Sequence, residues 1–528
     1  MWFTFAYYKG EYFLMRSRLW SDFAAHLPMI RSFSLGDNFP PEYPQFANEP
    51  SRYHFLFYML VGYMERIGIN LAFALNTLSA IGLSLLLIMI FKFAEYFYGV
   101  KKKGAIFAGV LAVFFFLFNS SLSYVDYFQE KGVSLATIAG VVQVEQFINF
   151  GPWNGDDISA FWHWNVYTNQ RHLAFSYALV LCIFWTLLRF SAKKKNQLSK
   201  TKRFLMILTM IVLPFFNLAA YAILLYMLFF WFVTNPSLIK KRLLFYLLLI
   251  VVSIPSFYCY WQLDVGKVIF SPGFMAAEKN LWGIIYYWWR NLGLYIILWP
   301  SLLVVGNKQQ KKWLLMVAGL FLVANLFQLS TDMINNHKLI NFFQLGIAVS
   351  LGVLLAKLWS RSLVAKLFVI LLIPLLTLSG VMDASAIIHD RQVMLPDVVN
   401  LQLGIWVINN TAADSVFVTN QYLYNPVSLV GRKTYLDYGY FAWSMGYQDR
   451  PRRENLLDIF APDSELDRWC HLMTKEQIDY VMLSPGKGDF EFDPRDSWLV
   501  LKNSPIYEMD EYQIFSTKTV CSSQINRL

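Results

Sequence analysis

Eight long apolar runs constrain the fold of this chain more than any other feature of its sequence. Each run has the length of a membrane-spanning helix, which needs about 20 predominantly apolar residues. Only 15% of the 528 residues are charged, whereas soluble domains carry roughly 25%. We therefore expect a mainly α, polytopic membrane protein. The runs cover residues 71–92, 104–122, 173–190, 243–260, 284–305, 313–329, 339–358 and 363–381.

A further apolar block, residues 204–233, is too long for one span and is interrupted by Leu213-Pro-Phe-Phe-Asn217. Basic residues flank the block on both sides, so we interpret it as a hairpin of two short helices. With this hairpin, the membrane region holds about ten helices. Residues 53–67 are also apolar, but this run is short and carries Glu65 and Arg66, which favours an interfacial helix.

The net charge of +10 arises from basic clusters that lie between the apolar runs. Such clusters mark cytoplasmic loops by the positive-inside rule, so membrane lipid is the expected neighbour and nucleic acid is not an expected partner. The remaining loops and everything after Met382 then face the outside of the cell membrane. The basic clusters are 101–103, 193–203, 240–242, 308–312 and 357–366.

The composition divides the chain into three parts: an external segment with amphipathic helices (1–69), a transmembrane domain (70–382) and an extracytoplasmic α/β domain (383–528). In the last part we expect buried strands at 414–419 and 479–484, a helical stretch around 465–469 and an alternating strand at 507–517. Cys470 and Cys521 could pair there if the domain faces an oxidising space. Cys182 and Cys259 lie in apolar runs and are interpreted as helix-packing thiols.

The first residues do not explain how the N-terminal segment reaches the outside of the membrane. An external N-terminal segment needs a signal peptide or a preceding span, and residues 1–19 are neither, because Lys9, Glu11, Arg16 and Arg18 interrupt them. We therefore expect an upstream transmembrane helix that is missing from this reading frame.

The external segment contains the first candidate site, centred on Asp22. Asp22 and His26 are four residues apart, so on a helix they share a face. A carboxylate in a partly dry outer cavity can act as general base, because desolvation raises its pKa. Asp22 could instead cap a helix, since Ser21 and Asp22 are both good N-cap residues. Supporting roles are expected for His26, Asp37, Glu42 and His54.

Two cations open membrane spans from the outside, against the usual charge bias. Lys338 follows Asn335, Asn336 and His337, and it is well placed to neutralise a phosphate at headgroup depth. His337 could add a hydrogen bond to the same anion. Arg171 opens another span and offers a planar fork that matches phosphate oxygens. The alternative for Lys338 is simple snorkelling to the interface.

The outer loop 124–167 mixes acids with tryptophans, including Asp126 and His163. Aromatic faces beside carboxylates suit carbohydrate, although tryptophan and tyrosine also gather at membrane interfaces without any ligand. The acids could instead hold a divalent cation such as Mg²⁺ or Mn²⁺ through oxygen ligands, but no spacing specifies one. No cofactor is certain from the sequence.

These segments resemble the polytopic GT-C glycosyltransferases, which include protein mannosyltransferases and aminoarabinose transferases and use sugars carried on polyprenyl phosphates. The resemblance covers most of the chain through short, degenerate motifs. Two departures stand out: the family's first span is missing, and Asn335 stands where an acid is frequent, so any acidic role there is lost or passes to Asp332. The motifs are Trp20-Ser-Asp22, His26, Arg31-Ser-Phe33, Asn38-Phe-Pro-Pro41, Tyr53-His54, Asn169-Gln-Arg171, Leu213-Pro214, Asn291-Leu-Gly293, Asn336-His-Lys338 and Gly431-Arg432.

The resemblance implies a membrane glycosyltransferase that moves a sugar from a polyprenyl-phosphate donor to an extracytoplasmic acceptor, which is a protein, a lipid or a polysaccharide. The resemblance implies that Asp22 is the catalytic base and that Lys338 and Arg171 contact the carrier phosphate. One alternative is a transporter or flippase for a lipid-linked or anionic solute, which predicts charges inside the spans. Another is a non-catalytic relative whose external domain binds a partner.

Overall fold

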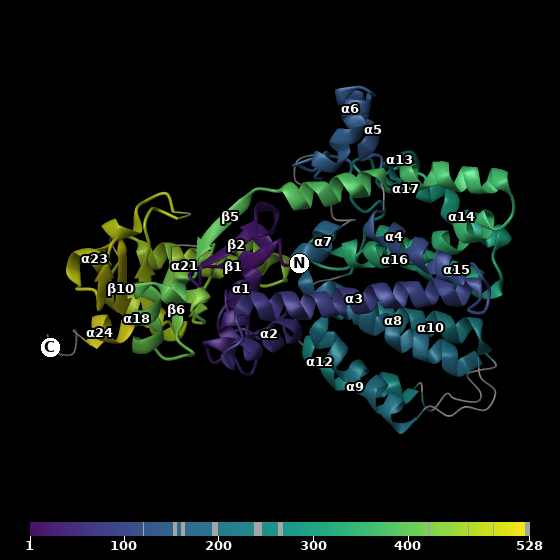
Figure 1. Ribbon diagram of the computed structural model, residues 1–528. Coiled ribbons are helices and arrows are strands. Elements are labelled where there is room, and N and C mark those ends of the chain that lie inside the picture. Colours follow the sequence, from purple (N-terminus) through teal and green to yellow (C-terminus); the bar gives the residue numbers. More distant parts are fainter. Residues whose placement is uncertain are drawn as a thin grey trace.

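The computed structural model contains a bundle of long apolar helices joined to a smaller α/β domain at the C-terminal end of the chain (Figure 1). It describes the whole chain except residues 120, 152–155, 160–163, 193–198, 237–244, 246, 262–267, 421–422, 463, 489 and 523–528. Within these described residues, four helical segments are long and apolar enough to cross a membrane: Leu71–Tyr98, Arg171–Arg189, Met333–Trp359 and Leu363–His389. The chain is therefore a multi-pass membrane protein, as the apolar runs predict.

The central helix of the bundle is α16 (His337–Trp359), whose apolar stretch is entirely buried by its neighbours. It packs closely on α4 (Ala105–Leu117) because Gly352 has no side chain: a Cβ there would lie 2.6 Å from the Ala112 backbone nitrogen. Small residues allow such close contact between membrane helices. α17 (Leu363–His389) is more peripheral, with a third of its apolar stretch buried.

The remaining membrane region consists of shorter or broken helices. The block predicted as a hairpin contains two helices: Pro214 lies in the last turn of α9, and the Asn217 side chain then caps α10. The span predicted at 284–305 consists of two helices, α13 and α14, between which the chain bends by 92° at Gly293, which has a φ of 51°. The predicted span 243–260 lies partly outside the described residues. The bounds are α3 Leu71–Tyr98, α8 Arg171–Ala192, α9 Lys200–Phe216, α10 Leu218–Thr234, α12 Ile254–Trp261, α13 Leu281–Leu292, α14 Tyr295–Val305 and α15 Lys308–Leu326.

Basic clusters from distant loops meet at one end of the bundle. The Lys357 ammonium donates to the Gln310 side-chain oxygen (3.0 Å), and the Gln310 amide donates to the Phe97 carbonyl (2.6 Å). Lys312 donates to the side chain of Asn235 at 2.6 Å. Three clusters that the charge pattern assigns to one side of the membrane thus lie together.

A small antiparallel sheet links the start of the chain to the segment after α17. β1 (Phe5–Tyr8) and β2 (Tyr12–Arg16) form a hairpin, and β2 also pairs with β5 (Gln392–Pro396). In Figure 1 this sheet lies between the helical bundle and the C-terminal domain. The hairpin leads into α1 (Trp20–Ser34), which packs on α2 (Leu56–Arg66), the helix predicted at 53–67.

The C-terminal domain is built on a mixed five-stranded sheet with the order β7-β6-β8-β10-β9. The strands predicted at 414–419 and 479–484 correspond to β6 (Val416–Thr419) and β8 (Tyr480–Leu483), which pair in parallel. The single strand predicted at 507–517 is instead the hairpin of β9 (Tyr507–Met509) and β10 (Tyr512–Ser516). α17 continues past residue 383 to His389 before the domain begins. The other elements of the C-terminal domain are α18 Gln402–Asn410, α19 Pro426–Leu429, β7 Lys433–Thr434, α20 Gly439–Ser444, α21 Arg450–Phe460, α22 Leu466–Lys475, α23 Trp498–Lys502 and α24 Thr517–Ser522.

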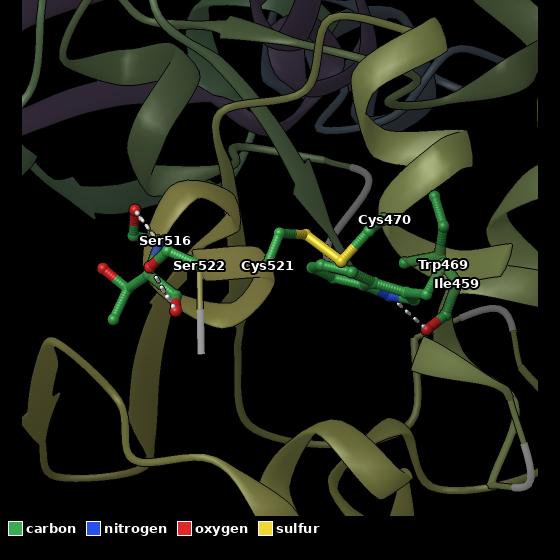
Figure 2. Close-up of a disulfide and its surroundings, with 7 residues drawn as sticks. Ile459, Trp469, Cys470, Ser516, Cys521 and Ser522 are labelled. Atoms are coloured by element: carbon green, nitrogen blue, oxygen red, sulfur yellow. Dashed lines mark hydrogen bonds between the residues drawn. A yellow bond between two sulfur atoms is a disulfide. The ribbon is translucent and has the colours of Figure 1, made fainter. Parts of the chain in front are cut away.

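A disulfide joins Cys470 of α22 to Cys521 of α24, which are 51 residues apart in sequence (Figure 2). The pairing considered from the sequence is therefore present. The bond lies beside Trp469, whose indole N–H donates to the Ile459 carbonyl at 3.2 Å. Closing a loop of this length restricts the unfolded chain, so the bond stabilises the domain. Cys182 and Cys259 are free thiols.

Candidate active site

Asp22 lies in the first turn of α1 and does not cap it. The helix begins at Trp20, the cap position is Leu19, and no side chain caps this end. The carboxylate stays partly exposed, and within the described part of the chain it has no hydrogen bond and no ion pair shorter than 4 Å. The capping alternative is therefore wrong, and Asp22 is an acid without a structural partner.

Lys338 faces this acid from the start of α16. Its ammonium lies within electrostatic reach of Asp22 and Asp332, but it donates a hydrogen bond to the neutral side-chain oxygen of Asn335 at 3.0 Å. Lys338 is 8% exposed, so it does not snorkel into water, and Tyr177 donates a short hydrogen bond to its backbone carbonyl. Among the described residues, this largely buried ammonium has no carboxylate within ion-pair distance, which makes it a candidate site for an anion.

The surroundings of Asp22 tune its proton affinity. Burial by protein atoms disfavours the charged form and raises the pKa of Asp22 to about 6, although Lys338 opposes this shift. A carboxyl with such a pKa is ionised near neutral pH yet more basic than an ordinary aspartate. This is the property that general-base chemistry requires.

His26 and His54, the histidines predicted to support Asp22, both lie near His172. His26, one turn further along α1, stacks on the Tyr58 ring at 4.7 Å. His54 contacts His172, the second residue of α8, at 3.9 Å between ring centroids. Burial, together with the positive charge of Arg171, lowers the pKa of His26 to about 3, and burial lowers the pKa of His54 well below its ordinary value.

Arg171 is close to this cluster but lies deeper than the sequence suggests. Its guanidinium is 1% exposed and donates to the Thr168 carbonyl (2.6 Å), the Asn76 side chain (2.8 Å) and the Thr4 hydroxyl (2.8 Å). All three acceptors are neutral, so its charge is not cancelled locally. It also faces the ring of Phe23, the neighbour of Asp22, at 5.5 Å. Arg171 therefore contributes a positive field to the site.

His337 also lies inside the helical bundle. One ring nitrogen contacts the Asn341 side-chain oxygen at 2.8 Å, and the other contacts the Gln170 amide at 3.1 Å. Because both nitrogens have neighbours in the protein, His337 mainly links α16 to the start of α8. Its contact with a phosphate stays a prediction.

Asp37 and Glu42 lie against the C-terminal domain. Asp37 is exposed, and its backbone nitrogen donates to the Ala413 carbonyl at 3.1 Å. Glu42 forms an ion pair with Lys433 at 3.0 Å. These contacts give both residues a role in holding the external segment on the domain, and their supporting role in catalysis stays a prediction.

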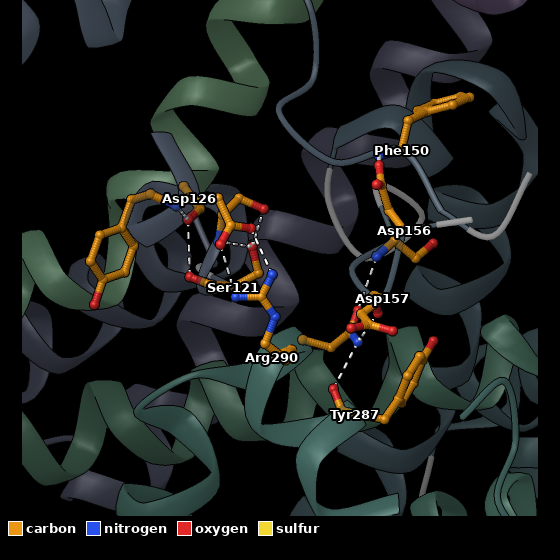
Figure 3. Close-up of polar contacts among 12 residues, drawn as sticks. Ser121, Asp126, Phe150, Asp156, Asp157, Tyr287 and Arg290 are labelled. Atoms are coloured by element: carbon orange, nitrogen blue, oxygen red, sulfur yellow. Dashed lines mark hydrogen bonds and ion pairs between the residues drawn. The ribbon is translucent and has the colours of Figure 1, made fainter. Parts of the chain in front are cut away.

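The outer loop after α4 forms its own polar network (Figure 3). Asp126 of α5 (Ser123–Lys131) accepts two hydrogen bonds, of 2.9 and 2.7 Å, from Arg290 of α13. Asp156 accepts from the Phe150 backbone at 2.8 Å. His163 lies outside the described residues. No group of three or more His, Cys, Asp and Glu side chains in the described ranges is arranged to hold a metal ion.

Tyrosines around Asp22 were not predicted from the sequence. The rings of Tyr53 and Tyr58 lie 6.2 Å apart, and the Tyr58 hydroxyl contacts His172 at 2.9 Å. From the C-terminal domain, the Tyr424 ring lies 4.2 Å from that of Trp20, and Tyr440 donates to Asp332 at 2.7 Å. The C-terminal domain thus contributes directly to the surroundings of the acid.

Backbone contacts hold α1 against that domain. A Cβ on Gly431, which has a φ of +84°, would lie 2.6 Å from the Arg31 carbonyl oxygen, and a Cβ on Gly36 would lie 2.1 Å from the Gly431 oxygen. Arg432 is 2% exposed. Its guanidinium donates to backbone carbonyls at the end of α18 and to the backbone carbonyl of Leu35. The Gly431-Arg432 motif therefore positions the helix that carries Asp22.

Comparison with known proteins gives matches only among solved structures. No family model matches the chain, and no curated protein sequence matches it. The chain is similar to the crystal structure of ArnT from Cupriavidus metallidurans in the apo state, with a TM-score of 0.47 and 11% identity over 94% of this chain and 93% of that one. It is also similar to the structure of ArnT from the same organism bound to undecaprenyl phosphate, with a TM-score of 0.48 and 10% identity over the same shares of the two chains.

Proposed function

We propose that this protein is a membrane glycosyltransferase that takes a sugar from a polyprenyl-phosphate carrier and transfers it to an acceptor on the extracytoplasmic face. One observation carries the proposal: Asp22, an acid without a structural partner, lies within electrostatic reach of Lys338, a buried ammonium without a close carboxylate. A base and an anion site held apart by the fold are the two groups that transfer from a glycosyl phosphate needs.

Asp22 acts as the base in this scheme. Its carboxylate takes the proton from the acceptor hydroxyl, and the acceptor oxygen forms a bond to the anomeric carbon of the donor sugar. The bond between that carbon and the phosphate oxygen breaks, and its electron pair leaves with the carrier phosphate. Attack from the side opposite the phosphate inverts the anomeric carbon.

Lys338 stabilises the charge that develops on the leaving phosphate. Fixed charge aimed at a leaving group is commonly the largest electrostatic contribution to such a step, because a dry site needs no reorganisation during the reaction. The start of α16 adds the positive end of a helix dipole beside the same lysine. Arg171 contributes from deeper in the bundle through its uncompensated charge.

The arrangement of the chain supports an extracytoplasmic site. Lys102, Lys312 and Lys357 lie in the basic clusters that gather at one end of the bundle, and the positive-inside rule assigns that end to the cytoplasm. α1 and α2 lie beside the C-terminal domain, at the other end of the long helices (Figure 1). A carrier lipid would reach Lys338 from the membrane, and the acceptor would approach from the C-terminal domain.

Transfer in membrane vesicles tests the proposal. A panel of radiolabelled polyprenyl-phosphate sugars is offered to vesicles that contain the native protein or Asp22→Asn. We expect transfer of at least one sugar by the native protein and a loss of about 100-fold or more in the variant. Equal transfer by both proteins contradicts the role of Asp22. Uptake of donor into the vesicle lumen without transfer to an acceptor would instead indicate the transporter.

A further inference from the structure

Three histidines from separate elements converge beside Asp22 and Lys338. His26 comes from α1, His54 from the segment before α2, and His172 from the start of α8. The rings of His54 and His172 lie 3.9 Å apart, and those of His26 and His172 lie 6.4 Å apart. Their exposed fractions are 3%, 8% and 0%, so each ring is shielded from bulk water.

Each of these rings carries a nitrogen without a partner. His26 Nδ1, His54 Nε2 and His172 Nε2 are buried and make no hydrogen bond within the described part of the chain. A buried polar atom without a hydrogen bond costs about 1–3 kcal/mol. Most such atoms in folded proteins have a partner, so three together in one cluster need an explanation.

The remaining sides of the rings are fixed by aromatic contacts. Tyr58 stacks on His26 and contacts His172 Nδ1 at 2.9 Å through its hydroxyl. The ring of Tyr53 lies 3.6 Å from that of His54. Because the rings cannot reorient freely, the unpartnered nitrogens stay in place, which is the preorganisation that a binding site requires.

The charge around the cluster defines what it can bind. Arg171 lies near His26, and Lys338 lies near His54. Burial, followed by the charge of Arg171, lowers the pKa of His26 to about 3, so its protonated form is disfavoured. A neutral imidazole has one N–H donor and one acceptor nitrogen. It therefore suits hydroxyl groups, which both donate and accept, rather than the phosphate, which needs donors and positive charge.

We propose that His26, His54 and His172 form the subsite that binds the hydroxyl groups of the donor sugar. This inference rests on the proposed function and adds the residues that recognise the transferred group. Lys338 is close to both His54 and His172, so a sugar whose phosphate contacts Lys338 lies against these rings. The subsite selects donors by their hydroxyls, since a missing hydroxyl leaves a buried nitrogen unpaired.

Binding of two synthetic carriers to the purified full-length protein tests the subsite. One probe is a polyprenyl phosphate bearing a single hexose, taken from the panel that supports transfer, and the other is the same polyprenyl phosphate without sugar. We expect His54→Phe, which keeps an aromatic ring but removes both nitrogens, to weaken binding of the glycosylated probe about tenfold. Binding of the sugar-free probe should change less than twofold. His471→Phe, at an exposed position in α22, is the matched control and should affect neither probe.

The outcomes separate this inference from the proposed function. Equal weakening of both probes by His54→Phe, or no weakening of either, overturns the sugar subsite while Lys338 still accounts for phosphate binding. If the native protein binds neither probe, the proposed function fails and the subsite fails with it. If His54→Phe does not fold, as judged by its melting temperature, the same comparison is made with His26→Gln and His54→Gln.

Discussion

Asp22 of α1 and Lys338 of α16 attract each other across the site without forming an ion pair. Their positions are set by different contacts: Lys338 is held by Asn335 at 3.0 Å, and α1 is held by the C-terminal domain through Gly36 and Gly431. If the two charges met, each would satisfy the other and neither would be available to a substrate. Keeping the two charges apart therefore lowers the stability of the protein but leaves both charges available for function.

Replacement of Asp22 by asparagine should not destabilise the protein. Because the pKa of Asp22 rises from 3.8 to about 6 on folding, its ionised form opposes folding at neutral pH by up to about 3 kcal/mol, reduced by its partial exposure. We expect the melting temperature of Asp22→Asn in detergent to equal or exceed that of the native protein. Glu11→Gln, at an exposed acid between β1 and β2, is the control and should leave both melting and transfer unchanged. A clear fall in the melting temperature of Asp22→Asn would mean that Asp22 is structural.

The pH dependence of transfer should report the same group. The base must be ionised, so we expect the rate to be low at pH 5, to rise through a midpoint near 6 and to level off above pH 7. Stability changes in the opposite sense: a raised pKa means that the folded state binds the proton more tightly, so this contribution to stability falls as pH rises from about 4 to 6. Rates are measured in vesicles at constant ionic strength. A profile that is flat between pH 5 and 7 would exclude Asp22 as the rate-determining base.

Loss of the Lys338 charge should weaken binding of the carrier. Lys338→Met keeps the length of the side chain and removes the ammonium, so affinity for sugar-free polyprenyl phosphate should fall about tenfold or more. Lys312→Met is the matched control, because Lys312 also donates to uncharged oxygens but lies in a basic cluster at the other end of the bundle. Binding is measured with the purified protein at fixed salt. Similar losses in both variants would mean that the effect is not specific to the site.

The sequence predicted the helices and the principal charges of the site better than it predicted their surroundings. Asp22 and Lys338 could be found because a charge at the edge of an apolar run is costly and therefore conspicuous. Tyr424 and Tyr440 could not be found, because an aromatic residue in a mixed domain has no such signal, and their approach to α1 depends on how the C-terminal domain docks.

Local patterns also missed structure that depends on distant pairing. The hairpin of β1 and β2 is stabilised by β5, which lies hundreds of residues later in the chain. The bend at Gly293 was missed because apolar periodicity continues across it. The hydrogen bonds of Arg171 to Thr4 and Asn76 join it to other segments, so they could not be predicted from the sequence around it.

A buried ion pair behind the site offers a test of how α1 is anchored. Arg31 near the end of α1 contacts Asp397 at 2.8 Å and Glu65 of α2 at 3.2 Å. Asp397 is 2% exposed and also accepts a short hydrogen bond from Tyr7 of β1. This network joins α1, α2 and β1 to the segment that follows β5.

Arg31→Met should be strongly destabilising, because it leaves Asp397 buried without its cation, at a cost of about 3–5 kcal/mol. Adding Asp397→Asn removes that charge and keeps a side-chain oxygen for the Val399 backbone, so the double variant should melt at a higher temperature than Arg31→Met alone. The exposed pair of Arg450 and Glu454 is the control, and Arg450→Met should change the melting temperature little. If the effects of Arg31→Met and Asp397→Asn simply add, the two residues are not coupled.

If they are coupled, Arg31→Met should also slow transfer at temperatures below its melting transition, because a loosened α1 misplaces Asp22 relative to Lys338.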